Sequence, residues 1–480
     1  MPVVWSIAYL GIMLLLGHVL VSAVWRGERR PLGELAGLSA TLGAGGLGVL
    51  FFWLSLAGLI PTRGVTLSMG LVLLVAHAVL WRMGRLSLPM PMSPAGASTT
   101  TGNRIMTLAA WTVVALLVVV ASVHALGLPL YEWDGFAIWG MKAKVLSTES
   151  LRAGPTYFHD VSLSYSHLDY PLLVPFLTAG AYGMMGQFHE QLGKVYFPLL
   201  FLAFGLVLNT GLRWKLDSLR AGMLTAVAMS VPVLVRWAGA GTADVALALY
   251  YTGMLCYSIR WLDEGNLRDL LIVMLCTVSC IFTKSEGLAL ALIQVLGLFL
   301  FSAFVPGRRR LAGLAVLVAG VLALSLPWLV WSGGLPRTHE NYAANLNLAN
   351  VFANWDRLRV ILPEFARQVT AWERWGILWV LLAFSTICGW RRFRERHVAV
   401  LWFFLIAHLG LYVLIFIVTP WDVRELLASA LDRLILHTVP AAVLLIGFHW
   451  ALPQHPTAGM TPATAQAASR ARRRTSAHRR

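Results

Sequence analysis

The chain has 480 residues, of which 58% are hydrophobic and only 12% are charged, and its formal net charge is +16. A mean hydropathy of +0.70 excludes an ordinary soluble domain. Because apolar runs of about 20 residues are too long for barrel strands, the sequence predicts an all-α polytopic membrane protein. The positive charge lies in short arginine-rich loops, as is typical of cytoplasmic segments, so we expect contact with membrane lipids and no nucleic-acid partner.

Hydropathy predicts about 13 membrane-crossing helices, and the charge of the loops orients them. The predicted spans are 3–24, 36–60, 65–81, 105–127, 195–212, 220–237, 245–261, 270–283, 287–304, 311–331, 375–390, 398–418 and 433–450. Basic loops such as 25–35, 305–310 and 391–397 belong in the cytoplasm. This assignment places the N-terminus outside and the C-terminus in the cytoplasm.

One apolar segment, 171–187, does not fit this pattern of crossings. It is short, contains Pro171 and Pro175, and carries three glycines. Counting it as a crossing would also move every later basic loop to the outside. We therefore predict a re-entrant segment or one that lies at the outer interface.

The predicted spans divide the chain into four regions. These are a four-helix membrane region over 1–127, a large extracytoplasmic loop over 128–194, a helix bundle over 195–450 with outer loops at 332–374 and 419–432, and a tail over 451–480. The tail is basic and low in complexity, so we expect it to be disordered and cytoplasmic, next to anionic lipid headgroups.

The polar chemistry of the chain begins directly after the fourth span, with Glu132 and Asp134. Residues 135–147 are predicted to form an amphipathic helix on the outer membrane surface, interrupted by Lys142 and Lys144. A carboxylate beside lipid experiences a low dielectric constant, which suits a proton acceptor. Asp134 is therefore the first candidate for a general base and Glu132 the second, the alternative being a solvated loop whose acids cap helices.

The same loop contains further polar residues that could contact a substrate. They are His159, Asp160, Asp169 and Tyr170. None of them belongs to a motif that is specific by itself.

Three charged residues interrupt later apolar runs. Asp244 stands where an outer turn enters a helix, so N-capping explains it without a function. Its place on the same membrane face as Asp134 favours a substrate contact. Lys284 and Glu286 lie in a tight outer turn, where a lysine could hold a phosphate; a plain turn is the alternative.

The last outer loop offers more cations at the start of the final span. Arg424 lies on a predicted interfacial helix, and Arg433 and His437 are one helical turn apart where the chain enters the membrane. An anionic ligand would relieve the cost of this placement. An internal salt bridge to Asp432 or Asp422 is the alternative.

Several sequence segments occur in an order that resembles a known family. HLDYPLLVP, GTAD, TKSEG and TPWDVRELLASALDRLILHTVP follow an acidic residue after an early helix. The chain resembles the GT-C superfamily of integral-membrane glycosyltransferases, especially the bacterial branch near protein mannosyltransferases and the lipid A aminoarabinose transferase. The resemblance extends over about 128–445 and implies a GT-C-like fold in the bacterial inner membrane.

The resemblance also implies an activity and roles for residues. Such enzymes take a sugar from a polyprenyl-phosphate carrier at the outer face and invert the anomeric centre; the acceptor is a lipid, a polysaccharide or a protein. By position, Asp134 would be the base, and Lys284, Arg424 and Arg433 would bind the donor phosphate. Tyr170 would open the segment that shapes the donor pocket.

The resemblance leaves a cofactor open. Some relatives need a divalent metal and others do not, and Asp134 with Asp244 is the pair that could hold one.

Two other classes of protein remain as alternatives. A transporter or flippase of a lipid-linked sugar would place charges near mid-membrane and show inverted repeats, whereas the candidate charges here gather at one face. A polysaccharide ligase or polymerase with a different fold would need a polymer-length donor. The chain has no P-loop, HExxH, GxSxG or paired CxxC motif. No motif therefore indicates an ATP-driven transporter, a metalloprotease or a serine hydrolase.

Overall fold

The computed structural model describes residues 1–90, 100–303, 308–336 and 342–451, and the regular elements among them are all helical. The all-α prediction is therefore confirmed for these residues. The predicted disordered tail over 451–480 lies, from residue 452 onward, outside the described part of the chain.

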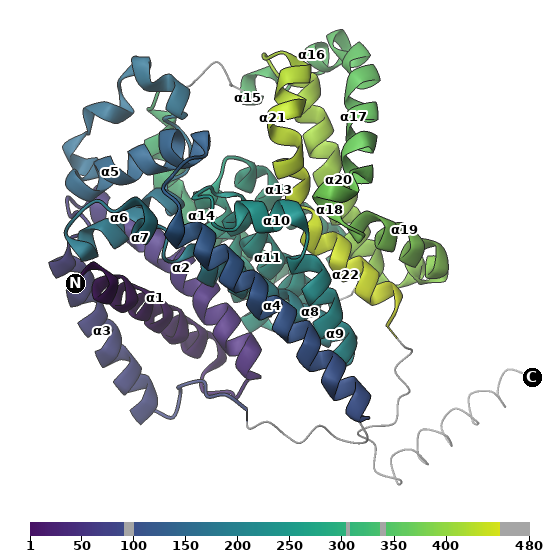
Figure 1. Ribbon diagram of the computed structural model, residues 1–480, viewed down its shortest axis with the longest axis horizontal. Helices are drawn as coiled ribbons and strands as arrows, with labels where there is room; N and C mark the ends of the chain where they lie inside the picture. The colour runs from purple at the N-terminus through teal and green to yellow at the C-terminus, as the bar shows by residue number, and fades with distance from the viewer. Residues whose placement is uncertain (91–99, 304–307, 337–341, 452–480) are drawn as a thin grey trace, which may run out of the picture.

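The helices follow one another in three groups (Figure 1). The first is α1 (Pro2–Trp25), α2 (Leu32–Leu56), α3 (Arg63–Arg82) and α4 (Thr101–Gly127). The second contains a π-helical turn (Asp134–Gly140), α5 (Met141–Thr148), 3-10 turns at Leu151–Ala153, Thr156–Phe158 and Val161–Ser166, then α6 (Leu173–Met185) and α7 (Glu190–Gly193). The third is α8 (Phe197–Arg213), α9 (Ser218–Met229), α10 (Pro232–Trp237), α11 (Asp244–Glu264), α12 (Leu267–Thr283), α13 (Glu286–Ala303), α14 (Arg308–Gly333), α15 (Tyr342–Asn345), α16 (Leu348–Ala353), α17 (Leu358–Thr370), α18 (Trp372–Trp375), α19 (Leu378–Cys388), α20 (Arg396–Val418), α21 (Val423–Leu436) and α22 (Val439–His449).

Among the described residues, seven helices are long and apolar enough to cross a membrane. The number is eight if α21 and α22, which meet at a bend of 44°, form one span. This supports a multi-pass membrane protein, and the count of about thirteen stays a prediction. The residues predicted as one span over 220–237 form two helices, because Pro232 cannot donate a backbone hydrogen bond to α9 and instead begins α10.

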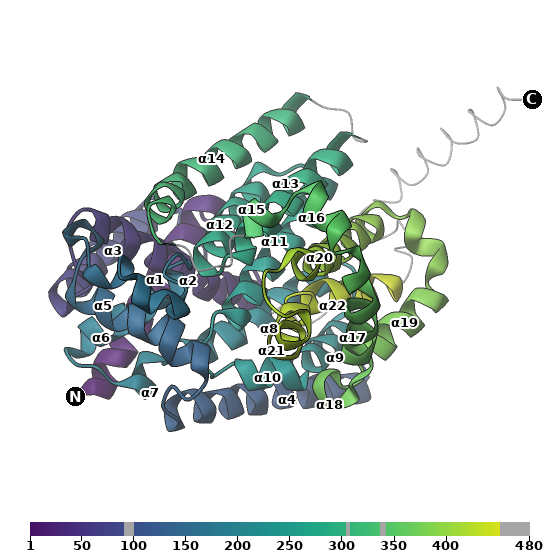
Figure 2. The same cartoon turned by 90° about the horizontal axis from the view of Figure 1, so that it is seen from above.

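The centre of the bundle is α11, which is buried along almost its whole length. α8 and α12 pack along it, and α2 packs against both of these helices (Figures 1 and 2). α3 and α4 lie at the periphery, where exposed side chains such as Leu71 and Val123 cover their outer surfaces. Outer surfaces this apolar are suited to contact with lipid rather than with water.

Close packing of α1 on α2 depends on two glycines. A Cβ atom at Gly17 would lie 1.7 Å from the carbonyl oxygen of Ser39, and one at Gly43 would lie 2.1 Å from that of Met13. Small residues allow helix backbones to approach closely within a membrane. These glycines therefore set the distance between the first two helices.

The segment after α4 is helical over all the residues predicted, 135–147. A π-helical turn occupies its first half, and α5 continues from it and packs against α6. Lys142 is fully buried, whereas Lys144 is exposed. The predicted helix is therefore confirmed, with one buried and one exposed side, and its place along the membrane surface stays a prediction.

The segment predicted to be re-entrant or interfacial, 171–187, contains α6. This helix is buried on nearly all sides. Its 13 residues extend about 20 Å, which is shorter than the hydrocarbon core of a bilayer. This length is compatible with a re-entrant or interfacial segment.

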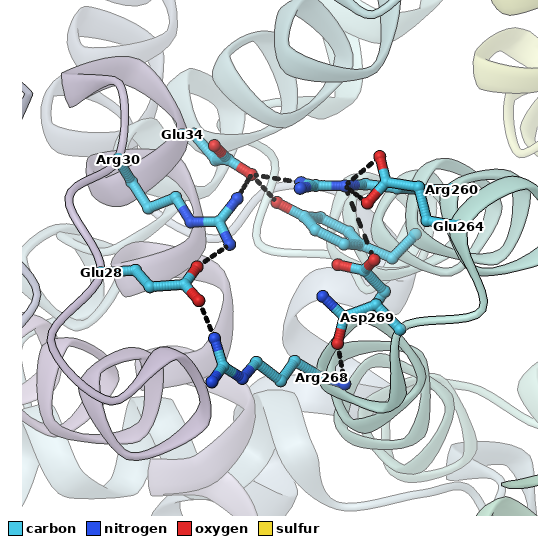
Figure 3. Close-up of polar contacts among 9 residues, drawn as sticks. Glu28, Arg30, Glu34, Arg260, Glu264, Arg268 and Asp269 are labelled. Carbon is cyan, nitrogen blue, oxygen red and sulfur yellow. Dashed lines mark hydrogen bonds and ion pairs between the residues drawn. The ribbon is translucent and has the colours of Figure 1, made fainter.

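At the end of the bundle that carries the basic loops, charged side chains join two turns (Figure 3). Glu34 on α2 accepts hydrogen bonds from Tyr257 Oη at 2.8 Å and Arg260 Nη1 at 3.3 Å. Arg260 Nε also lies 3.5 Å from Asp269 on α12. The charged residues of this network, labelled in Figure 3, are Glu28, Arg30, Glu34, Arg260, Glu264, Arg268 and Asp269. This network fastens the α1–α2 turn to the α11–α12 turn.

Candidate active site

Charged side chains from four distant segments meet at the other end of α11. They are Asp134 from the π-helical turn, Asp244 from the first turn of α11, Lys284 and Glu286 from the turn between α12 and α13, and Arg433 from α21. We call these five residues the central charge cluster. The sequence named all five as candidate site residues, and ion pairs connect them in the structure.

Asp244 is the residue that joins the cluster. Its Oδ1 lies 2.9 Å from Lys284 Nζ and its Oδ2 lies 3.2 Å from Arg433 Nε. The carboxylate is completely buried and stands at the positive end of the α11 dipole. A buried charge is tolerated only when it is paired, so Asp244 holds both cations in fixed positions.

Arg433 connects the two aspartates that the sequence suggested as a metal pair. Its guanidinium contacts Asp134 as well as Asp244, and it lies 5.0 Å from the ring centre of Trp237. The planar fork of arginine suits two carboxylates at once, and the indole covers its face. A cation of the protein therefore stands between these carboxylates.

Lys284 owes its place to a tight break between two helices. α12 ends at Thr283, and Lys284 is extended, with φ −155° and ψ 155°. α13 begins two residues later, with Glu286 Oε1 at 3.0 Å from Lys284 Nζ. A Cβ atom at Gly287 would lie 1.9 Å from the carbonyl oxygen of Cys280, so only glycine permits this turn. The TKSEG segment thus brings a lysine and a glutamate into the bundle.

Exposure of the side chains increases across the central charge cluster. The exposed fraction is 0% for Asp244, 6% for Lys284, 13% for Arg433 and 22% for Asp134. Asp134 is therefore at the mouth of the cluster, where a substrate could reach it. Asp244 is at the back, where it can only position its neighbours.

A close contact followed by two hydrogen bonds leads from Asp244 into α20. His437 Nε2 lies 3.4 Å from Asp244 Oδ1, and His437 Nδ1 is 2.8 Å from Tyr412 Oη. Tyr412 Oη is in turn 2.6 Å from His408 Nε2. Because His437 Nε2 faces a carboxylate, the neutral ring carries its proton there, and Tyr412 then donates to Nδ1 and accepts from His408.

Sequence reasoning named His437 but missed Tyr412 and His408. A signal was present, since the two residues are four apart in the otherwise apolar run 398–418. That spacing puts both on one face of a helix. The apolar residues around them in the sequence do not indicate which other helix packs against that face.

Three glycines and a lysine hold the turn that carries Asp134. A Cβ atom at Gly135 would lie 2.8 Å from the carbonyl oxygen of Ala240, and one at Gly241, whose φ is +82°, would lie 2.4 Å from Leu130. Gly140 is in similar close contact with Leu130. Lys194 Nζ donates to the carbonyl oxygens of residues 128 and 129, at 2.9 and 3.1 Å. These contacts fix the Asp134 turn against the turn that precedes Asp244.

Glu132 and Arg424, both predicted for the site, lie apart from the central charge cluster. Glu132 pairs with the exposed Arg236 at 3.3 Å, so the two first-loop carboxylates take different partners. Arg424 lines a groove between α17 and α21. It is nine residues from Arg433, which places the two arginines on opposite sides of α21.

The candidates later in the first loop do not contact the cluster either. His159 and Asp160 are exposed, and Asp160 accepts hydrogen bonds from Ser162, which lower the pKa of its carboxyl group. Asp160 therefore caps a 3-10 turn, as expected if the acids of this loop only cap helices.

Asp169 and Tyr170 belong to a second group of side chains, around Lys142. Burial lowers the pKa of the Lys142 ammonium to about 7, against the opposing effect of the Asp169 carboxylate. Lys142 donates to the carbonyl oxygen of His167 and lies 5.6 Å from the Tyr170 ring centre. This group packs the loop 157–170 against α5.

Within the described residues, no group of three or more His, Cys, Asp and Glu side chains is arranged to hold a metal ion. The suggested pair of Asp134 and Asp244 is joined by the Arg433 guanidinium instead. The cluster as it stands combines three carboxylates with two cations, so one permanent negative charge is in excess when His437 is neutral.

No protein-family model matches the chain, and a search of curated proteins finds no match either.

Proposed function

We propose that the chain is an inverting membrane glycosyltransferase that moves a sugar from a polyprenyl-phosphate-linked donor to a cell-envelope acceptor at the extracytoplasmic face. The observation that supports this proposal is the meeting of Asp134, Lys284 and Arg433 in one cluster between membrane-type helices. The reaction needs a base for the acceptor and positive charge for a phosphate leaving group, and the cluster contains both.

In the proposed reaction, a phosphate oxygen of the donor replaces the Asp134 carboxylate at Arg433. The guanidinium suits a phosphate as well as it suits a carboxylate, and Lys284 adds a second positive charge behind it. Asp244 and Glu286 keep these cations in position. Entry of the anionic donor thereby releases Asp134, because the phosphate takes its place as the anionic partner of Arg433.

The released Asp134 then acts as the general base. It accepts the proton of the acceptor hydroxyl, whose oxygen forms a bond to the anomeric carbon while the bond from that carbon to the phosphate oxygen breaks. The polyprenyl phosphate leaves with the electron pair and is stabilised by Arg433 and Lys284. Attack from the side opposite the phosphate inverts the anomeric centre.

The test is sugar transfer by the purified full-length protein from a panel of polyprenyl-phosphate sugars to cell-envelope acceptors. Asp134→Asn is the variant, and Asp160→Asn, an exposed cap in the same loop, is its matched control. We expect transfer by the wild type and the control and its loss in a folded Asp134→Asn protein. Absence of transfer with every donor, from folded wild type, would contradict the proposal.

One observation favours the transport alternative. Tyr412 and His408 extend the cluster into α20, which is long enough to cross a membrane, and buried polar chains of this kind occur in ion-coupled transporters. Flipping of a fluorescent lipid-linked sugar in vesicles, without any transfer to an acceptor, would support transport over catalysis.

A further inference from the structure

A groove between α17 and α21 carries more positive charge than its surroundings neutralise. It has a volume of about 360 Å³ and lies on the side of α21 that faces away from the central charge cluster. Its lining residues are Arg359, Val360, Pro363, Glu364, Arg367, Arg424, Leu427 and Ala428. Three arginines against one glutamate leave an excess of two positive charges.

Two of the three arginines have no ionic partner in the described part of the chain. Glu364 is paired with Arg367, whose Nε donates to it at 2.8 Å. Arg359 and Arg424 make no side-chain hydrogen bond or ion pair among the described residues. Arg359 is one and two helical turns from Pro363 and Arg367, so these residues share one face of α17. Two unneutralised guanidinium groups therefore face one groove from two helices.

Part of the lining of the groove is apolar. Leu427 is 2% exposed, and the half-buried Val360 and the exposed Ala428 line the groove beside it. Trp421, three residues before Arg424 in the chain, is 47% exposed. An exposed tryptophan close to arginine is typical of the membrane interface, where apolar side chains contact acyl chains and arginines contact headgroups.

We propose that this groove binds the phosphate-bearing headgroup of an anionic lipid, with Arg359 and Arg424 contacting the phosphate. Arginine pairs with phosphate through two parallel hydrogen bonds, and two arginines from different helices can hold one phosphate between them. The apolar lining residues and the exposed Trp421 favour a lipid over a soluble anion. Arg424 thereby takes part in a second anion site instead of the central charge cluster.

The test is retention of lipid by the purified full-length protein, measured by native mass spectrometry with phosphatidylglycerol and phosphatidylcholine as probes. The variant is Arg359→Gln with Arg424→Gln. The matched control is Arg82→Gln with Arg85→Gln, which removes two exposed arginines near the end of α3. We expect the wild type to prefer phosphatidylglycerol and the groove variant to bind it roughly 25-fold more weakly, since each arginine near a headgroup contributes about a fivefold factor.

Three results would overturn the proposal. One is an equal loss of affinity in the control, which would mean that the lipid responds to net charge alone. Another is equal binding of the two lipids by the wild type. The third is displacement of the lipid by inorganic phosphate at matched concentration, which would identify a soluble-anion site. Lipid retention is measured without sugar transfer, so this outcome and that of the transfer assay are separate.

Discussion

Arg433 Nε on α21 lies 3.2 Å from Asp244 Oδ2 at the start of α11, although the two residues are 189 positions apart in the chain. The same guanidinium contacts Asp134, so one side chain connects the segment after α4, the start of α11 and α21. The site therefore exists only when these three parts of the chain are assembled.

Loss of the Asp244 charge should destabilise the protein. Asp244→Asn removes the carboxylate that pairs with the buried Lys284 and Arg433. Breaking a buried ion pair in this way costs about 3–5 kcal/mol. Unfolding by denaturant in mixed micelles measures this change. Asp422→Asn, an exposed N-cap of α21 that asparagine can also fill, is the control and should shift stability by less than about 0.5 kcal/mol. Equal effects would mean that Asp244 does not hold the cluster together.

The two first-loop carboxylates should differ in their effect on transfer. Asp134→Asn should lower the rate by about 10²–10⁴-fold, because it removes the proposed base. Glu132→Gln removes only an ion pair with an exposed arginine, which corresponds to less than about a fivefold change. The rates are compared at saturating donor in the same assay. A larger loss in Glu132→Gln would move the base to Glu132.

Removal of the Tyr412 hydroxyl should cost stability, whereas removal of the Tyr251 hydroxyl should not. Tyr412 Oη joins two buried histidines, so Tyr412→Phe leaves ring nitrogens without a partner at a cost of about 1–3 kcal/mol. Tyr251 Oη is buried without a hydrogen-bond partner in the described structure, so Tyr251→Phe loses no bond. Thermal unfolding followed by tryptophan fluorescence compares the two. Equal losses would show that the histidine chain contributes nothing.

The buried Lys142 should make stability depend on pH. Its pKa is about 7 in the folded protein and near 10.5 when the chain is unfolded. Between these values the unfolded state binds a proton that the folded state has lost, so stability should rise as the pH increases from about 7 to 10.5, by an amount on the order of 4 kcal/mol. Below pH 7 Lys142 is protonated in both states, so it does not change the free energy of unfolding with pH.

Two substitutions separate this effect from that of other groups. Lys142→Met should remove the rise in stability, because the buried group no longer titrates. Lys144→Met, at the exposed neighbour on α5, should keep it. Parallel pH profiles of wild type and Lys142→Met would contradict the prediction.

Addition of one methyl group at Gly17 should loosen the contact of α1 with α2. The new Cβ would meet the Ser39 carbonyl oxygen at 1.7 Å, and overpacking of this kind costs about 1–3 kcal/mol. Gly11→Ala on the same helix is the control, since no atom lies within 4 Å of its Cβ. Denaturant midpoints of the two variants, measured in the same detergent, should differ. A stable Gly17→Ala protein would mean that the helices are not in this register.

Much of the candidate site could be predicted from the sequence. Charged residues that interrupt apolar runs carry a high free-energy cost, and the sequence placed Asp134, Asp244, Lys284 and Arg433 at helix ends on one face for that reason. The structure brings these four together. It does not bring Arg424 or Glu132 with them, because loop position says nothing about which side of a helix a residue occupies.

The sequence by itself determined the helical character of the chain and its membrane-type composition, since long apolar runs without charges allow no other spanning structure. Only the tertiary structure decided the partners. It buried Lys142 within a helix predicted to lie along the membrane surface, placed Arg433 between the two carboxylates suggested as a metal pair, and brought Tyr412 and His408 next to His437. The physical reason is that hydropathy depends on each residue alone, whereas pairing of charges depends on contacts between segments that lie far apart along the chain.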